Sequence, residues 1–133
     1  MSSTVLTNDT RVLIIDDDKS ILHILSKILE KKGFKVDTAQ SGQEAMRKLA
    51  AKTYSVALID VRLQDTNGLD LLIKIQEIAP KMRKILLTGY PSDEDRIKAL
   101  ERGADYYLAK PVDSEKLIEI MSTKTGKDRT NNF

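Results

Sequence analysis

Acidic, hydroxyl and basic side chains follow the short apolar runs of this sequence. In chain order they are Asp16, Asp17, Asp18, Asp60, Thr88 and Lys110. Two unit charges about 4 Å apart repel by roughly 4 kcal/mol at an effective dielectric near 20, so clustered carboxylates require a counter-charge. Oxygen ligands without histidine or cysteine favour a hard cation such as Mg²⁺ over zinc. The aspartates therefore predict a magnesium site.

The remaining two side chains favour a phosphoryl group at the same place. Lys110 adds a fixed positive charge and Thr88 a hydroxyl donor. A carboxylate, a divalent cation, a lysine and a hydroxyl together complement the negative charge of a phosphoryl group during transfer. An aspartate can itself be the nucleophile and form an aspartyl phosphate, and Asp60 is the candidate.

Alternating apolar and amphipathic segments would bring these residues to one edge of a sheet. Strands are predicted over Val12 to Ile15, Lys35 to Ala39, Val56 to Ile59, Ile85 to Leu87 and Asp105 to Leu108. Helices are predicted over Ser20 to Lys31, Gly42 to Ala51, Leu69 to Ile78, Ser92 to Glu101 and Asp113 to Met121. Five strand and helix repeats imply an α/β fold, a doubly wound five-stranded parallel sheet. Ligands bind such sheets beyond the carboxyl ends of the strands.

Composition narrows the class of protein. The 133 residues, 41% hydrophobic and 32% charged, suit one domain, predicted over residues 11–123 between a polar extension (1–10) and a polar tail (124–133). The absence of cysteine excludes disulfides and cysteine-ligated zinc. A net charge of +2, spread along the chain, argues against direct nucleic acid binding. No signal peptide or membrane span is evident, so we expect no membrane association and a cytoplasmic location.

Four motifs in this order, LIIDDDKS, ALIDVRLQDTNG, ILLTGY and GADYYLAKP, resemble the receiver domain of response regulators, the phosphoacceptor half of two-component signalling. The resemblance covers about Arg11 to Met121. It implies a flavodoxin-like (βα)5 fold with strand order 2-1-3-4-5. It also implies that a histidine kinase or histidine phosphotransfer protein donates the phosphoryl group. The domain would then catalyse only its own phosphorylation and dephosphorylation, and is not otherwise an enzyme.

The resemblance also implies the roles of the acidic residues. Asp60 would be the phosphoacceptor, and Asp16 and Asp17 would hold Mg²⁺, Asp17 directly and Asp16 largely through water. The backbone carbonyl of Arg62 would be a further metal ligand, beside Asp60 itself.

Further roles concern the phosphoryl group and the response to it. Thr88 and Lys110 would contact phosphoryl oxygens, and the peptide bond between Lys110 and Pro111 is expected to be cis. Tyr107 matches the switch aromatic, which turns inward when Thr88 moves toward the phosphoryl group, and Gly68 matches the turn glycine of the family. The fourth helix, fifth strand and fifth helix would form the surface that binds a downstream protein or a second copy.

Two departures from the usual family pattern lie in the predicted loops. Gln64 stands where many relatives have proline, which leaves the stiffness of its loop open. Arg62 and Tyr90, two residues beyond Asp60 and Thr88, are bulky, and the resemblance implies that these positions border the path of the hydrolytic water. We predict that they shield the phosphoryl group and slow its hydrolysis.

Several residues have simpler interpretations than a functional one. Asp18 is expected to cap the first helix rather than bind metal. His23, the single histidine, falls opposite the apolar stripe of that helix, formed by Ile21, Leu22, Ile24, Leu25, Ile28 and Leu29, and is expected at the surface. Tyr106 is expected to pack in the strand or to be exposed.

Two other functions remain open from the residues alone. A phosphohydrolase of the haloacid dehalogenase type also uses Asp-x-Asp after a strand, a spacing that Asp16 and Asp18 present, but this reading would leave Asp60 without a role. A phosphorylation-independent interaction domain would typically lack one of the acidic residues that are intact here. The residues after Met121 are too few and polar to form an effector domain, so we expect either a stand-alone receiver or a fragment of a longer regulator.

Overall fold

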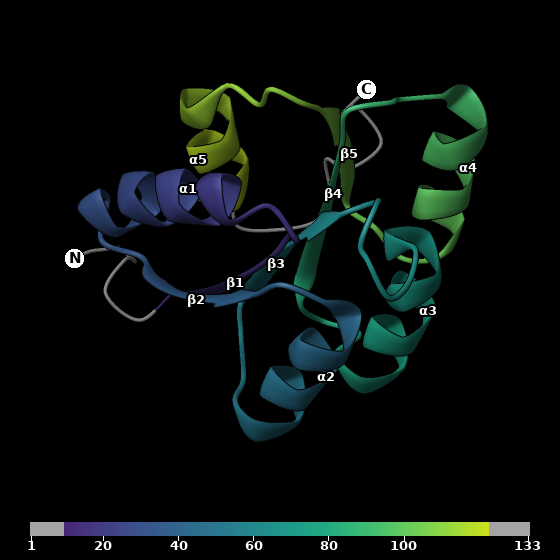
Figure 1. Cartoon of the computed structure of the whole chain (residues 1–133), viewed down its shortest axis with the longest axis horizontal. Coiled ribbons are helices and arrows are strands. Elements are labelled where there is room, and N and C mark those ends of the chain that lie inside the picture. Colours follow the sequence, from purple (N-terminus) through teal and green to yellow (C-terminus); the bar gives the residue numbers. More distant parts are fainter. Residues whose placement is uncertain (1–9, 123–133) are drawn as a thin grey trace.

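The computed structural model describes residues 10–122, which form a five-stranded parallel sheet with five helices (Figure 1). The elements are β1 (Arg11–Ile15), α1 (Lys19–Lys31), β2 (Lys35–Ala39), α2 (Gly42–Ala51), β3 (Val56–Asp60), α3 (Gly68–Ile78), β4 (Arg83–Thr88), α4 (Asp93–Glu101), β5 (Tyr106–Ala109) and α5 (Ser114–Ser122). The strand order β2-β1-β3-β4-β5 confirms the predicted topology. Apart from residue 10, the predicted polar extension and tail lie outside the described residues, so the domain boundaries stay a prediction.

Helices cover both faces of the sheet. Successive side chains of a strand point to opposite faces, so each buried strand contributes side chains to two hydrophobic cores, one on each face of the sheet. Ile14 and Leu58 pack with Leu117 of α5, whereas Ile59 packs with Leu72 of α3. Figure 1 shows the result, with α1 and α5 together on one side of the sheet and α2 and α3 on the other.

Two site residues belong to the strands rather than following them. Asp60 is the last residue of β3 and Thr88 the last of β4, so each observed strand extends one residue beyond the end of the predicted apolar run. Parallel pairing continues to both residues, because Asp60 is in register with Leu87 and Thr88 with Ala109. The sheet therefore holds the backbone of both residues rigidly, at its carboxyl edge.

Helix α1 differs from its predicted apolar stripe at one residue. Leu22, Leu25 and Leu29 are buried as expected, but Ile24 is 56% exposed. At about 100° per residue, Ile24 lies beyond the margin of the face that these leucines define. The prediction that Ile24 belongs to the buried stripe is therefore wrong, whereas His23 is exposed as predicted.

None of the helices between residues 10 and 122 has the length and apolarity that crossing a bilayer requires.

Candidate functional site

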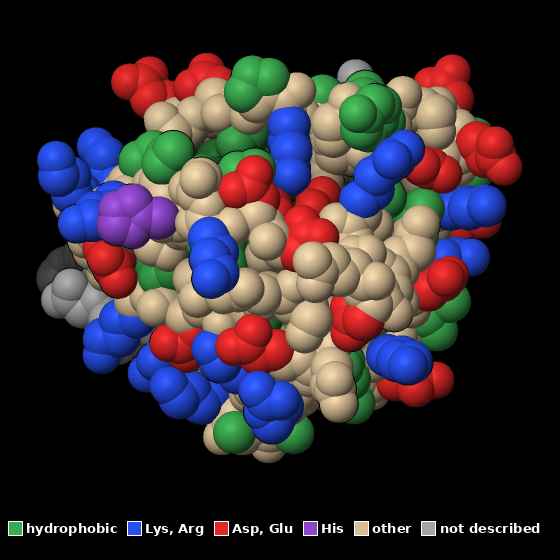
Figure 2. Space-filling view, in the orientation of Figure 1, with side chains coloured by type: hydrophobic (Ala, Val, Ile, Leu, Met, Phe, Trp, Pro, Cys, Tyr) green, Lys and Arg blue, Asp and Glu red, His purple; other side chains and the backbone are tan. Residues whose placement is uncertain are grey.

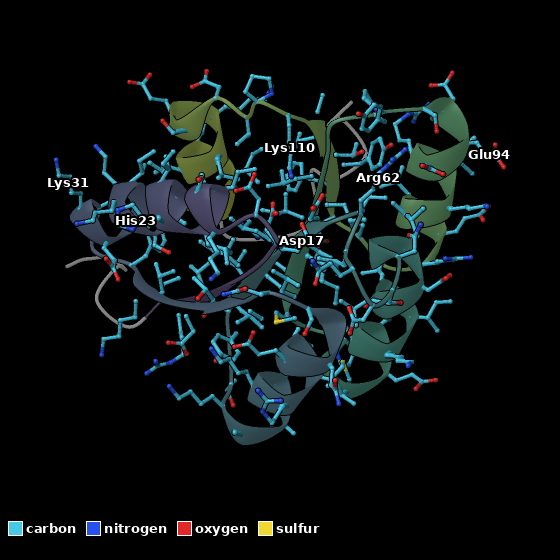
Figure 3. The ribbon with its side chains drawn as sticks, in the orientation of Figure 1. Asp17, His23, Lys31, Arg62, Glu94 and Lys110 are labelled. Carbon is cyan, nitrogen blue, oxygen red and sulfur yellow. The ribbon has the colours of Figure 1, made fainter. Side chains whose placement is uncertain are left out.

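The three aspartates predicted as metal ligands converge at the carboxyl edge of the sheet. Asp16 and Asp17 follow β1, and Asp60 ends β3. One carboxylate oxygen from each lies within 4.8 Å of the other two. Figure 2 shows acidic side chains in the middle of this face, where Figure 3 labels Asp17. Because every donor is a carboxylate oxygen, the set suits a hard divalent cation such as Mg²⁺.

Lys110 supplies positive charge to the same cluster. Its Nζ lies 2.9 Å from Oδ2 of Asp16 and 3.2 Å from Oδ1 of Asp60. Its backbone N–H donates to the carbonyl of Thr88 at 2.8 Å, which anchors the lysine beside β4. Figure 3 shows Lys110 above Asp17, and Arg62 above it to the right. The structure thus joins the predicted lysine to the predicted acceptor.

Burial and charge set the protonation behaviour of this pair. Burial raises the pKa of Asp60 and the negative charge of Asp16 raises it further, while Lys110 only partly offsets both. Burial lowers the pKa of Lys110, but its hydrogen bond and attraction to Asp16 and its pairing with Asp60 outweigh this, so the pKa is raised overall. One lysine therefore does not neutralise three carboxylates, and a bound cation would.

A glycine allows α3 to begin against the backbone of Asp60. A Cβ on Gly68 would collide with the carbonyl oxygen of Asp60 and lie 2.9 Å from Cα of Val61. The N–H of Gly68 donates to the carbonyl of Val61 at 2.6 Å. The glycine predicted from the resemblance therefore has a steric reason in this chain.

Arg62 and Tyr90 stack on each other beside the acceptor. The Arg62 guanidinium carbon lies 4.2 Å from the centre of the Tyr90 ring, a cation–π contact between the β3–α3 and β4–α4 loops. The backbone N–H of Arg62 also points to Oδ1 of Asp60, at 3.4 Å. The two residues predicted as a shield are thus in contact. The metal role of the Arg62 carbonyl stays a prediction.

The two predicted switch residues both contact the β4–α4 loop. Oγ1 of Thr88 accepts from the backbone N–H of Tyr90 at 3.0 Å. The hydroxyl of Tyr107, which is buried, accepts from the backbone N–H of Ser92 at 3.1 Å, and Ser92 is the N-cap of α4. Tyr106, the residue before it in β5, is buried on the opposite face of the sheet.

Other predicted features also occur, but outside the acidic cluster. The carboxylate of Asp18 caps α1 by accepting from the N–H groups of Ser20 and Ile21, so it does not join the acidic cluster. His23 lies further along α1 (Figure 3). The peptide bond before Pro111 is cis, as expected.

One contact near the site is not predicted by the sequence. Oδ1 and Oδ2 of Asp65 accept from the N–H groups of Gly42 and Gln43, each at 2.9 Å. Asp65 is more than twenty positions away from both donors in the chain. Local spacing therefore holds no signal for the contact, which depends on how α2 packs beside the β3–α3 loop.

Comparison with known proteins identifies the same architecture. The chain is 37% identical over 116 residues to the photosynthetic apparatus regulatory protein RegA of Cereibacter sphaeroides, covering 87% of this chain and 63% of RegA. A CheY-like receiver structure from Methanospirillum hungatei aligns with a TM-score of 0.82 at 39% identity, covering 84% of this chain and 90% of that one.

A further structure contains a modified aspartate. The response regulator from Burkholderia pseudomallei, with a phosphorylated aspartic acid and a calcium ion, aligns with a TM-score of 0.82 at 32% identity, covering 86% of this chain and 68% of that one. The chain spans less than two thirds of the length of RegA. The family model described as response regulator receiver domain matches residues 12–122. The chain belongs to the response regulator receiver domain family.

Proposed function

We propose that Asp60 accepts a phosphoryl group from a phosphohistidine of a histidine kinase or histidine phosphotransfer protein. The observation that carries this proposal is the convergence of Asp16, Asp17, Asp60 and Lys110 from three strand ends onto one point. The family relationship supports a signalling domain that is a phosphoacceptor. The identity of the accepting residue is our assignment.

The two carboxylate oxygens of Asp60 have different surroundings. Oδ1 pairs with Lys110 and accepts from the N–H of Arg62, whereas Oδ2 has no hydrogen bond within residues 10–122. Oδ2 is therefore the oxygen available to attack phosphorus. In the transfer, a new P–O bond forms as the P–N bond of the phosphohistidine breaks, and the imidazole leaves with the electron pair. Lys110 and the hydroxyl of Thr88 then stabilise the phosphoryl oxygens.

The carboxylates of Asp16, Asp17 and Asp60, with the carbonyl of Arg62, would hold Mg²⁺. Bound Mg²⁺ neutralises negative charge on the carboxylates and on phosphoryl oxygens. The all-oxygen donor set, clustered within 4.8 Å, supports this assignment. Asp16 is 2% exposed, and its Oδ1 accepts from the N–H of Asp18 at 2.9 Å. We propose that it contacts the ion largely through water.

The proposed response runs through the β4–α4 loop. If Thr88 turns its hydroxyl toward a phosphoryl group, the N–H of Tyr90 loses its present acceptor. The same loop is tied to Tyr107 through Ser92. Phosphorylation therefore biases a surface formed by α4, β5 and α5, which we propose binds a downstream protein or a second copy of the domain. Direct nucleic acid binding by this chain is not expected.

Mass spectrometry after treatment with acetyl phosphate tests the proposal. Wild type should gain one phosphoryl group in the presence of Mg²⁺ and much less in EDTA, and Asp60→Asn should gain none. Equal modification of the variant, or no modification of wild type, would overturn the assignment.

The alternative functions have weaker support. Asp18 caps α1, so the Asp-x-Asp pattern of a phosphohydrolase is not assembled, and steady turnover of p-nitrophenyl phosphate would be needed to revive that reading. A phosphorylation-independent domain would bind its partners equally well as wild type and as Asp60→Asn, with or without a phosphodonor.

A further inference from the structure

We propose that Asp65 is a positioning residue for the metal site, because it fixes the β3–α3 loop on the N-terminus of α2. This inference rests on the proposed function, since the loop carries the Arg62 carbonyl that would bind the ion. Asp65 is not one of the three clustered carboxylates. Its effect therefore passes through the loop and not through direct ligation.

The carboxylate of Asp65 completes the N-terminal cap of α2. Its two oxygens accept from the N–H groups of Gly42 and Gln43 at 2.9 Å, while Oγ of Ser41 accepts from the N–H of Glu44 at 3.1 Å. The first N–H groups of a helix have no partner within the helix, and the helix dipole favours an anion there. The hydrogen bonds from Gly42 and Gln43 lower the pKa of Asp65, so the carboxylate remains charged at neutral pH.

The helix side of the contact is shaped to receive the loop. A Cβ on Gly42 would lie 2.6 Å from Cγ2 of Thr66, closer than side chains tolerate. With glycine at this position, the methyl group of Thr66 packs against the first turn of α2, and a Cβ here would force the Thr66 side chain to move. Two independent features, a carboxylate in the loop and a glycine in the helix, thus produce one docked position.

The loop is short and closed on itself, so fixing its outer end also restrains its inner end. The N–H of Leu63 donates to the carbonyl of Thr66 at 3.3 Å, and Arg62 forms an isolated antiparallel bridge with Asn67. Asp65 lies at the outer end of this turn and Arg62 at the inner end. Gln64 lacks the fixed backbone angle of the proline common in relatives, so the contact with α2 supplies restraint that the backbone does not.

The test measures Mg²⁺ affinity of the full chain by an NMR titration of amide signals, with thermal unfolding in EDTA recorded in parallel. Asp65→Ala removes the carboxylate, Asp65→Asn leaves one acceptor oxygen, and Gly42→Ala displaces the loop from the helix side without changing charge. Gln64→Ala is the matched control, because Gln64 is exposed in the same loop.

We expect Asp65→Ala and Gly42→Ala to raise the dissociation constant for Mg²⁺ roughly three- to tenfold, and Asp65→Asn to have a smaller effect. This lies below the 10–100-fold typical of residues that touch a metal ligand directly, since Asp65 acts one step further away. Gln64→Ala should stay within about twofold of wild type. Phosphorylation by acetyl phosphate at saturating Mg²⁺ should be retained in all four variants.

Three results would overturn the inference. Asp65→Ala could bind Mg²⁺ as wild type does, or could lose thermal stability with no change in affinity, which would leave only a structural cap. A loss in Asp65→Ala with normal binding by Gly42→Ala would assign the effect to charge and not to position. Wild type that neither binds Mg²⁺ nor becomes phosphorylated would instead refute the proposed function itself.

Discussion

Lys110 connects three strands through one amino group. Its Nζ contacts Asp16 after β1 and Asp60 at the end of β3, while the residue itself follows β5. A phosphoryl group on Asp60 would place new negative oxygens beside a cation that is already there. The lysine can therefore compensate carboxylate charge before transfer and phosphoryl charge after it, with little rearrangement.

The stacked pair Arg62 and Tyr90 should slow hydrolysis of the phosphorylated domain. Exposed cation–π contacts contribute about 0.5–1 kcal/mol, so we expect Arg62→Ala and Tyr90→Ala each to speed decay about two- to fivefold. The decay of phosphorylated protein after removal of the phosphodonor measures this rate. Gln64→Ala, in the same loop as Arg62, should decay as wild type does. Unchanged rates in both variants would show that the pair is no shield.

The raised pKa of Asp60 predicts that its charge destabilises the domain when no divalent ion is present. The folded state binds this proton more tightly than the unfolded chain, whose pKa is near 3.8. The stabilising contribution is therefore complete below that pH and is lost as pH rises through the raised folded value. At neutral pH, Asp60→Asn should be more stable than wild type by about 1 kcal/mol, or roughly 4 °C.

Thermal unfolding in EDTA measures this difference, and it should disappear as the pH falls below about 4, where Asp60 is protonated in both states. Addition of Mg²⁺ should stabilise wild type more than Asp60→Asn, because the variant has one carboxylate fewer. An Asp60→Asn variant that is less stable than wild type at neutral pH in EDTA would contradict the prediction.

At the scale of helices and strands, local patterns predicted the elements and the site for a topological reason. Residues after parallel strands must share one edge of the sheet, so Asp16, Asp60 and Lys110 could be placed together from spacing alone. Spacing could also have excluded Ile24 from the buried stripe, because at about 100° per residue it lies outside the face of Leu22, Leu25 and Leu29. It could not predict Asp65 against α2, since that contact joins residues far apart in the chain.

Helix α4 has few buried residues, and we expect the hydrogen bond at its N-cap to contribute to its stability. It buries only Ala99 fully, whereas α3 buries five residues. The hydroxyl of Tyr107 holds the backbone at Ser92, where α4 begins. Tyr107→Phe removes this acceptor, at a net cost of about 1 kcal/mol. We therefore expect hydrogen exchange of the α4 amides to become roughly fivefold faster.

Tyr54→Phe is the matched control for that experiment. The hydroxyl of Tyr54, which is also buried, donates to Asp37 at 2.7 Å, and Asp37 lies on the edge strand β2. Removing this hydroxyl should leave exchange in α4 unchanged. Equal acceleration in both variants would indicate general loss of stability and would refute a specific anchor at Tyr107.

At the scale of the whole molecule, an apolar groove lies next to the polar site. Ile21, Ile24 and Ile28 of α1 line it together with Pro111 and Val112, and Lys110 lies at its margin. A protein that presents a phosphohistidine to Asp60 must approach this edge of the sheet. The groove offers such a protein apolar contacts that a small phosphodonor does not need.

Charge introduced in this groove should therefore separate protein donors from small ones. The test uses a histidine kinase that phosphorylates wild type. With this kinase, Ile24→Asp should be phosphorylated about tenfold more slowly, as for a contact residue worth ~1.4 kcal/mol. Phosphorylation of the variant by acetyl phosphate should be unchanged. Ile78→Asp is the control, because Ile78 is 50% exposed, against 56% for Ile24, but ends α3 away from the groove. Equal rates for both variants with the kinase would exclude the groove as a docking surface. Slower reaction of Ile24→Asp with acetyl phosphate would instead mean that the substitution disturbs Asp60 itself.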